Sequence, residues 1–374
     1  MKNKTTIAVH AGANSDKNTG GINTPLVMSS AYDYLDQPEV RYPRYFNTAN
    51  HDAVAEKLCA LEGAEAGLVL ATGMAAISSI FLSILKRGDH VVFLDGLYGG
   101  THDFVTSELT PRGIEYDFAG TNADDIIAGV RSNTRLIYVE SPANPLMDVV
   151  DLAAIAEFAR DKGILTAIDN TFASPILQNP IRLGFDLVMH SATKYLGGHS
   201  DLCCGALLGS KVLIEQVRPQ AIRYGGSPDA HLCWLLERSL KTLAIRVERQ
   251  SDNALVVAQA LEGQSGFSRV MYPGLETHPA HLIAKKQMSG FGGMLSFELV
   301  ADADPVAYQR RLNIVVPAVS LGGVESTICQ PVMTSHAKMP VAERQRLGIT
   351  DNLLRLSTGI EAAEDIVEDL LQAM

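Results

Sequence analysis

A lysine at the end of an apolar strand is the residue whose setting most clearly suggests covalent chemistry. Residues 186–199 place Ser191, Thr193 and Lys194 on a loop that follows a buried strand pattern. A lone lysine in a loop is usually solvated. Here the two hydroxyls and the following Gly197 and Gly198 suit a desolvated lysine amine beside a bound anion. A desolvated amine is a good nucleophile. A nucleotide site could also use such a lysine, so a second signal is needed.

An acid at the end of an earlier apolar strand provides that signal. Asp169 follows Ala167 and Ile168 and precedes Lys194 by about 25 residues, a separation in line with one βαβ step. A carboxylate at a strand end normally caps a helix or lies exposed in a loop. Beside a cofactor lysine it can instead keep a pyridinium nitrogen protonated, which makes the ring an electron sink.

Two more turns follow apolar strands earlier in the chain. Residues 71–76 turn through Gly73 into a helical pattern, which leaves backbone N–H groups free at the helix start to hold a phosphate. Tyr98 follows the next strand and could lay its ring on a flat cofactor, although an isolated tyrosine is more often structural. Together with Asp169 and Lys194, these turns lie at the C-terminal ends of successive strands, where open α/β sheets bind ligands.

Apolar runs and helical patterns alternate along most of the chain. Strands are expected at 67–71, 91–94, 136–139, 165–168 and 187–189, and helices at 51–61, 73–86 and 152–162. Continuous apolar strands suit a sheet covered on both faces, so this alternation indicates an α/β domain. The first 50 or so residues have no sustained period and are expected to form an irregular arm. A long helix over about 231–261 is expected to lead into a smaller domain with strands at 294–299 and 353–357.

Size and charge narrow the range of partners. The 374 residues, 47% hydrophobic and 20% charged, suffice for one large α/β domain and a smaller one. The formal net charge of −11 and the lack of a basic run argue against nucleic acid and membrane as partners, which leaves a small molecule. With no signal-peptide core and no apolar run long enough to span a bilayer, a cytoplasmic location is expected.

Metal and disulfide chemistry have little support. The five cysteines, at 59, 203, 204, 233 and 329, form no zinc-like spacing and suit reduced, mostly buried side chains. His278 and His281 have helical spacing but are expected to be structural. The glycine-rich run 290–293 leads into a predicted strand, which favours tight packing over phosphate binding. We therefore expect no metal.

At these residues the chain resembles the trans-sulfuration, or Cys/Met metabolism, family of pyridoxal-phosphate (PLP) enzymes. This family includes cystathionine γ-synthase, cystathionine β- and γ-lyases, methionine γ-lyase and O-acetylhomoserine sulfhydrylase. The likeness covers nearly the whole length, at residues 10–12, 72–76, 98–101, 140–145, 169–173, 190–194, 198–201, 241–243, 272–274, 290–294, 320–323 and 355–361. So many ordered matches are specific to the family.

The resemblance implies the PLP-dependent transferase-like fold of the aspartate aminotransferase type, fold type I. A large α/β domain with a mostly parallel seven-stranded sheet would precede a smaller C-terminal α/β domain. The implied division is an N-terminal arm over 1–50, a PLP-binding domain over 51–245 and a small domain over 246–374.

The resemblance also implies roles for residues around the cofactor. Lys194 would form the Schiff base and shuttle protons, Asp169 would pair with the pyridine nitrogen, and Tyr98 would stack on the ring and act as acid or base. The phosphate would be held by two backbone amides and two hydroxyls, those of Gly73, Met74, Ser191 and Thr193.

On the substrate side, Asn144 would lie near the 3′-oxygen of the cofactor, and Arg355 would bind the substrate α-carboxylate through two parallel hydrogen bonds. Ser320 would help to position Lys194 and the bound amino acid. Tyr42 and Arg44 match a tyrosine and an arginine that complete the phosphate site of the neighbouring subunit in such relatives. The resemblance thus implies an obligate homodimer with shared sites, usually doubled into a tetramer.

Departures from the family pattern bear on the reaction. Asp103 stands five residues after Tyr98, where γ-synthases often place an arginine for an acylated homoserine, so an anionic γ-substituent would be repelled. Glu325 matches the acid that cystathionine-using relatives aim at a distal amino group. Arg41, Tyr45 and Phe46 also depart from the arm pattern, and their roles stay open.

These residues favour a lyase that cleaves the C–S bond of cystathionine or a similar sulfur amino acid, by β- or γ-elimination. The alternative is a γ-replacement transferase of the cystathionine γ-synthase or O-acetylhomoserine sulfhydrylase type. A catalytically idle PLP-binding relative is a third hypothesis. Lys194, Asp169, Tyr98 and Arg355 together argue against it.

Overall fold

Two β-sheets organise the chain, the larger one in its N-terminal two thirds. The computed structural model describes residues 1–337 and 339–374. Within these residues the larger sheet has seven strands in the order β1-β7-β6-β5-β4-β2-β3, and only β7 runs antiparallel to its neighbours. The strands are β1 (Ala66–Leu70), β2 (His90–Leu94), β3 (Glu115–Ala119), β4 (Thr134–Glu140), β5 (Leu165–Asp169), β6 (Leu187–Ser191) and β7 (Gly205–Gly209). The expected mostly parallel sheet is confirmed, and β3 and β7 are strands that the sequence patterns missed.

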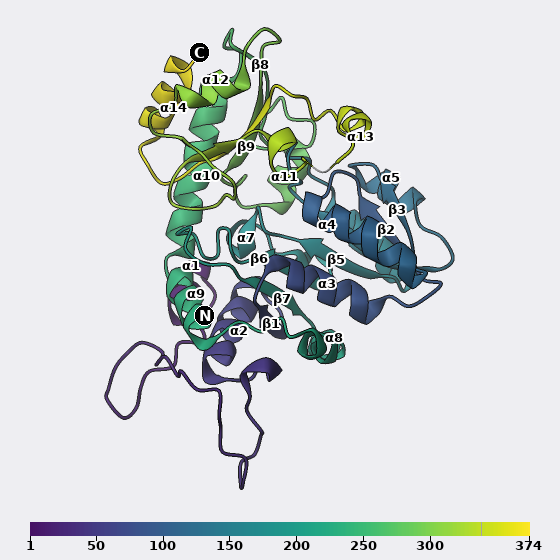
Figure 1. Cartoon of the computed structure of the whole chain (residues 1–374), viewed down its shortest axis with the longest axis vertical. Coiled ribbons are helices and arrows are strands. Elements are labelled where there is room, and N and C mark those ends of the chain that lie inside the picture. Colours follow the sequence, from purple (N-terminus) through teal and green to yellow (C-terminus); the bar gives the residue numbers. More distant parts are fainter. Residues whose placement is uncertain (338) are drawn as a thin grey trace.

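Apolar side chains cover both faces of this sheet, as its continuous apolar strands predict. In β1, Leu68 and Leu70 join the core with Ile77 of α3 (Gly73–Ile84). Val69 points to the other face and joins the core with Leu58 of α2 (Ala49–Glu62). Helices on both faces therefore fix the strand ends from which the loops depart (Figure 1).

The second sheet lies in the C-terminal third of the chain, where the sequence patterns predicted strands at 294–299 and 353–357. Its order is β10-β11-β12-β9-β8, and all pairs except β10 with β11 are antiparallel. These strands are β8 (Phe267–Met271), β9 (Met294–Leu299), β10 (Val316–Pro317), β11 (Thr327–Cys329) and β12 (Leu353–Ser357). Leu295 and Phe297 of β9 pack with Val257 and Leu261 of α10 (Leu243–Leu261). Figure 1 shows α10 running from the large sheet up to this second sheet.

The long helix expected over about 231–261 is two helices. α9 (Ala230–Leu240) ends at Lys241, and α10 starts after Thr242, whose φ of −108° and ψ of 6° leave the helical region. Apolar periodicity continues on both sides of the break, so the pattern alone did not reveal it. The predicted domain boundary between 245 and 246 falls inside α10 and stays a prediction.

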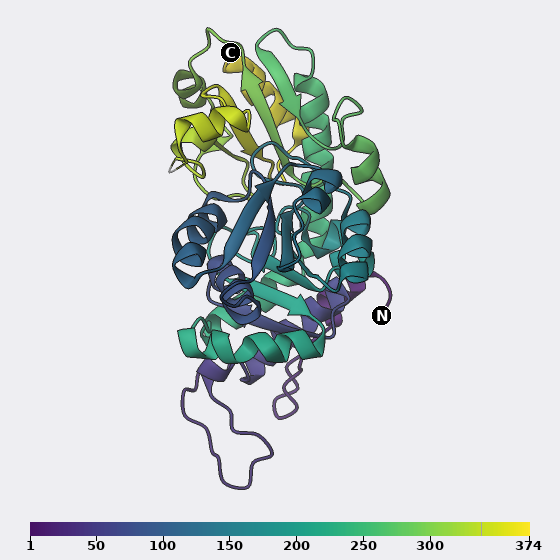
Figure 2. The same cartoon turned by 90° about the vertical axis from the view of Figure 1, so that its right-hand side faces the viewer.

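The N-terminal arm is less irregular than expected. Residues Lys4–His10 form α1, a seven-residue helix whose Ile7 and Ala8 are buried against α2. Lys57 of α2 donates from its Nζ to the carbonyls of Ala8 and Val9 at 3.0 and 3.3 Å, which satisfies the end of this short helix. Loops of the segment between α1 and α2 project from the body in both views (Figures 1 and 2), whereas Thr24 and Phe46 of this segment are buried. The segment also carries exposed apolar side chains, including Ile22, Met28, Tyr34 and Leu35.

The remaining helices connect or cover the strands. They are α4 (Gly99–Phe104), α5 (Ala123–Ala128), α6 (Leu152–Lys162), α7 (Ser174–Leu177), α8 (Lys211–Tyr224), α11 (His281–Gln287), α12 (Pro305–Arg310), α13 (Val341–Arg346) and α14 (Ala363–Gln372), with short helices η1 (Pro43–Tyr45), η2 (Val105–Leu109), η3 (Thr110–Arg112), η4 (Pro180–Leu183) and η5 (Pro331–Met333). Among the described residues, no helix is long and apolar enough to cross a membrane.

Candidate active site

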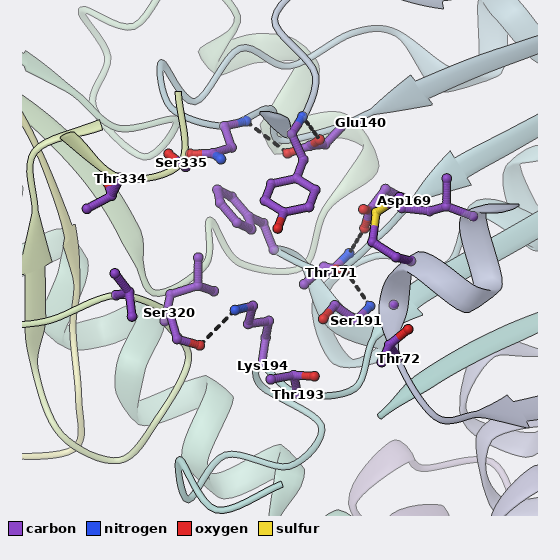
Figure 3. A pocket seen from close by; sticks show the side chains of 18 of the residues that line it. Thr72, Glu140, Asp169, Thr171, Ser191, Thr193, Lys194, Ser320, Thr334 and Ser335 are labelled. Carbon is purple, nitrogen blue, oxygen red and sulfur yellow. Dashed lines mark hydrogen bonds between the residues drawn. The ribbon is translucent and has the colours of Figure 1, made fainter. Parts of the chain in front are cut away.

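A cavity of about 600 Å³ lies at the C-terminal ends of β4, β5 and β6. Its wall also includes the start of α3 and, from the C-terminal third, Ser320 and Arg355. Ten of the residues predicted from the sequence line it: Gly73, Met74, Tyr98, Asn144, Asp169, Ser191, Thr193, Lys194, Ser320 and Arg355. Figure 3 shows several of these side chains converging on one space.

Lys194 lies in the turn after β6 and points into this cavity. Its Nζ donates to the Ser320 hydroxyl at 2.7 Å (Figure 3). Burial, with the charge of Arg355 nearby, lowers the pKa of Lys194 to about 8. A buried lysine with a lowered pKa has a larger fraction of neutral amine, the form that attacks carbonyl groups.

Asp169 is the last residue of β5, and its Oδ1 accepts the backbone N–H of Thr171 at 3.0 Å. Burial raises the pKa of Asp169, whereas the hydrogen bonding of Thr171 and the charges of His190 and Lys194 lower it. A buried carboxylate of this kind is stabilised by a cationic partner. It therefore suits a protonated ring nitrogen at this end of the cavity.

The part of the cavity lined by Gly73, Met74, Ser191 and Thr193 suits an anion and is called the anion corner below. Thr72 caps α3 by accepting the N–H of Ala75 at 3.0 Å, and the first N–H groups of a helix have no partner within the helix. A Cβ on Gly73 would lie 2.9 Å from the Cβ of Ser191, so only glycine allows this close approach. The hydroxyls of Ser191 and Thr193 line the same corner, which suits a phosphate.

Arg355 and Asn144 contact each other in the wall of the cavity. Arg355 Nη1 donates to Asn144 Oδ1 at 2.7 Å, although the two residues are 211 positions apart. Arg355 is only 5% exposed, and its Nε has no hydrogen-bond partner within the described residues. A buried cation with an unpartnered donor requires an anion, and a carboxylate matches the arginine fork.

Glu140 is a cavity residue that sequence reasoning did not single out. It is the last residue of β4, next to Asp169 in the sheet register. Its carboxyl accepts the backbone N–H groups of Tyr98 and Asn144, each at 3.0 Å. Burial and the neighbouring Asp169 raise the pKa of Glu140, whereas the hydrogen bonds from the N–H groups of Tyr98 and Asn144 lower it. An acid ending an apolar strand, the signal used for Asp169, could have identified it.

Four predicted site residues do not line the cavity formed by this chain. Glu325 is exposed and accepts the Ser200 hydroxyl at 3.1 Å, and Asp103 lies on α4 outside the lining residues. Arg44 donates to the Ile222 carbonyl at 3.1 Å, and Tyr42 is 41% exposed in the segment before α2. Their roles in specificity and across a subunit boundary stay predictions.

Two other sequence interpretations can be placed in the structure. His281 Nδ1 lies 2.9 Å from the Pro273 carbonyl, and its ring stacks on Phe291. The described residues contain no group of three or more potential metal ligands. The glycine-rich run 290–293 leads into β9, in line with a packing role.

The cavity therefore combines an amine, a buried carboxylate, an anion corner and a buried arginine. A planar phosphorylated aldehyde fits the first three groups, because the amine can form a Schiff base while the carboxylate faces a ring nitrogen. The arginine is left to bind the carboxylate of an amino acid.

Comparison with known proteins supports this interpretation. Residues 5–374 match the family model described as Cys/Met metabolism PLP-dependent enzyme. The chain is 43% identical to a cystathionine beta-lyase of Lactococcus lactis subsp. cremoris, over 99% of this chain and 98% of that protein. It is 40% identical to a cystathionine gamma-lyase of Bacillus subtilis, over 100% of this chain and 99% of that protein.

A solved structure shows the same arrangement of the whole chain. It is a cystathionine gamma synthase from Xanthomonas oryzae pv. oryzae in complex with cystathionine. The TM-score is 0.96 at 36% identity, and the match covers 100% of this chain and 98% of the other.

Proposed function

Because the chain belongs to the Cys/Met metabolism family of PLP-dependent enzymes, we propose that it cleaves the C–S bond of cystathionine or a similar sulfur amino acid. The observation that carries this proposal is the position of Arg355. Its buried guanidinium, with an unpartnered Nε, lines the same cavity as Lys194 and Asp169. An α-amino acid held there by its carboxylate would present its α-carbon to the lysine.

The cofactor of this family is PLP, and the cavity residues fit it. Lys194 would bind it covalently, Asp169 would face its ring nitrogen, and Tyr98 would cover its ring. Its phosphate would occupy the corner formed by Gly73, Met74, Ser191 and Thr193. When bound, PLP withdraws electrons from the α-carbon of an amino acid, so that a sulfur group on the β- or γ-carbon can leave.

The protein side chains would supply binding and proton transfer. Arg355 would orient the substrate carboxylate, and Asn144 would hold the guanidinium in place by accepting its Nη1–H group. The Nζ of Lys194 would take the α-proton, and its pKa of about 8 suits a general base near neutral pH. Ser320, 2.7 Å from that nitrogen, would keep the amine directed into the cavity.

Product analysis of purified enzyme loaded with PLP tests the proposal. Cleavage of cystathionine at the β-carbon, with water, gives homocysteine, pyruvate and ammonia, whereas γ-cleavage gives cysteine, 2-oxobutyrate and ammonia. We expect one of these sets and a shift of the cofactor absorbance band when cystathionine is added. Faster use of O-succinylhomoserine with cysteine than cleavage of cystathionine would overturn it.

That contrary result would favour the second candidate, a γ-replacement transferase. The observation behind this candidate is the TM-score of 0.96 to a cystathionine gamma synthase. The lyase is preferred because the two curated relatives compared above, at 43% and 40% identity, are a cystathionine beta-lyase and a cystathionine gamma-lyase.

The functional form is proposed to be a homodimer with shared sites, doubled into a tetramer. Tyr42 and Arg44 lie near the end of the N-terminal segment that precedes α2 and do not line the cavity of their own chain. The same segment exposes Ile22, Met28 and Leu35, which a second subunit would cover. An arginine delivered across this contact would add a charge-assisted donor to the phosphate site.

A further inference from the structure

The carboxyl group of Glu140 joins two loops of the active site. Its Oε2 accepts the N–H of Tyr98, which lies in the turn after β2, at 3.0 Å. Its Oε1 accepts the N–H of Asn144, which lies in the loop after β4, also at 3.0 Å. Figure 3 shows Glu140 beside the cavity with both hydrogen bonds drawn.

This connection continues into the C-terminal third of the chain. Asn144 accepts Arg355 Nη1 at 2.7 Å, and Arg355 lies on β12 of the second sheet. A path of hydrogen bonds therefore runs from Glu140 through Asn144 to the guanidinium proposed to bind the substrate carboxylate. Through its other oxygen, the same carboxyl holds the turn that carries Tyr98.

The two hydrogen bonds require the two acceptor oxygens of a carboxyl group. A glutamine at position 140 would have nearly the same shape but only one acceptor oxygen, and its NH₂ group would face an N–H donor. Glu140 is 5% exposed, so in the glutamine variant the N–H group that loses its acceptor would not form a hydrogen bond with water instead. Both oxygens are needed to keep the Tyr98 turn and Asn144 in place together.

We propose that Glu140 is a positioning residue, whose single carboxyl group aligns Tyr98 with the Asn144 and Arg355 pair. The inference rests on the proposed function, because it assigns Arg355 to the substrate carboxylate. Beyond the proposed function, it makes substrate affinity depend on Glu140, which reaches Arg355 only through Asn144.

Equilibrium binding of L-alanine, an amino acid without a leaving group, tests this role in the enzyme loaded with PLP. Absorbance titration gives its dissociation constant in wild type, Glu140→Gln, Asn144→Ala and the double variant. We expect each single change to weaken binding about tenfold, the effect of losing one buried hydrogen bond. The double variant should lose clearly less affinity than the product of the two single effects, because both changes disturb Asn144.

Glu237→Gln is the matched control. Glu237 is a buried glutamate of α9 that pairs with Lys57 Nζ at 4.0 Å and Lys241 Nζ at 3.8 Å and does not line the cavity. This change should lower the thermal unfolding temperature but leave L-alanine binding within about twofold of wild type. A comparable loss of affinity in the control would show that any buried charge change disturbs the site, and the proposal would fall.

Glu140→Asp covers the case in which Glu140→Gln does not fold. It keeps both carboxyl oxygens but is one methylene shorter, so it should also weaken L-alanine binding. Wild-type affinity in either variant, additive effects in the double variant, or failure of both variants to fold would overturn the positioning role. If the wild-type enzyme binds L-alanine but releases no keto acid from cystathionine, the proposed reaction fails and the Glu140 test still stands.

Discussion

The amine of Lys194 lies 2.7 Å from the hydroxyl of Ser320, a residue 126 positions later in the chain. Ser320 holds a left-handed backbone conformation with φ of 75°, which few non-glycine residues adopt. Such strain persists only where the surrounding structure maintains it. The contact brings the loop before β11 to the end of β6, so the cavity is complete only when both sheets have formed.

Removal of the amine is the most direct test of the site. We expect Lys194→Ala to lose cofactor on gel filtration and to lower turnover by at least about 10³-fold, because no other described cavity residue supplies an amine. Absorbance of the eluted protein and keto acid release measure these effects. Lys211→Ala, on the exposed start of α8, is the control and should keep both properties. Retention of near-normal activity in Lys194→Ala would remove the central assignment.

The lowered pKa of Lys194 predicts unusual reactivity of its amine in cofactor-free enzyme. A lysine amine reacts only when neutral, and a pKa of about 8 makes Lys194 mostly neutral above pH 8. An ordinary lysine, with a pKa of about 10.4, is still protonated there. Brief labelling with acetic anhydride, followed by mass spectrometry, should show half-maximal reactivity of Lys194 near pH 8. A midpoint at or above pH 10 would contradict burial as the controlling effect.

Arg44 is predicted to act on the cofactor of the neighbouring subunit. Arg44→Ala should weaken PLP retention about tenfold or more, because the phosphate loses a charge-assisted hydrogen bond. Equilibrium dialysis of the folded oligomer measures this affinity. Arg41→Ala is the control, since Arg41 pairs with Asp52 of its own chain at 3.0 Å.

Mixed oligomers show whether the arm crosses the subunit boundary. In a hybrid of Arg44→Ala and Lys194→Ala subunits, the Arg44→Ala chain keeps Lys194 and would receive an intact arm from its partner. Tight PLP binding should therefore return at that site. Hybrids that bind PLP no better than the Arg44→Ala homo-oligomer would show that Arg44 serves its own chain.

Local patterns predicted the part of the site that lies at strand ends. Asp169 and Lys194 each follow an apolar strand, and Gly73 begins a helix, so their meeting at one sheet edge follows from parallel strands. The contact of Arg355 with Asn144 could not be derived in this way. It joins the loop after β4 to β12 across 211 residues and depends on how the second sheet packs against the first.

The missed elements have a similar explanation. α1 has only seven residues, fewer than an isolated helix needs, and its stability comes from buried Ile7 and Ala8 and from Lys57. Its sequence alone therefore gives little signal. Likewise, Glu140 was noticed only as part of a family segment, because its two partners are backbone N–H groups that carry no sequence signature.

Glu325 is predicted to act on the distal half of a long substrate. Its carboxylate accepts the Ser200 hydroxyl and lies outside the cavity lining. We expect Glu325→Ala to raise KM for cystathionine more than for cysteine, because only the longer substrate extends a cationic group that far. Changes in the two KM values that agree within about twofold would show that Glu325 does not reach the distal amino group.

Asp103→Arg tests more directly the choice between lyase and synthase. Asp103 lies exposed on α4, five residues after Tyr98, and although it does not line the cavity, a charge at the protein surface acts over several ångströms. Asp103→Arg changes the local charge by two units, so an anionic γ-substituent should be attracted rather than repelled. We expect kcat/KM for O-succinylhomoserine with cysteine to rise roughly three- to tenfold, while that for cystathionine changes less. Salt should reduce the gain, because screening weakens interactions over this range.

Asp161→Arg is the matched charge reversal. Asp161 lies near the end of α6, next to the start of β5 and thus at the sheet edge opposite the cavity. The same change in net charge there should leave the ratio of the two kcat/KM values unaltered. An equal rise in both variants would indicate a general effect of net charge. No rise in Asp103→Arg would mean that the residue at 103 does not set the preference for thioethers, and the choice of a lyase would then rest on the relatives alone.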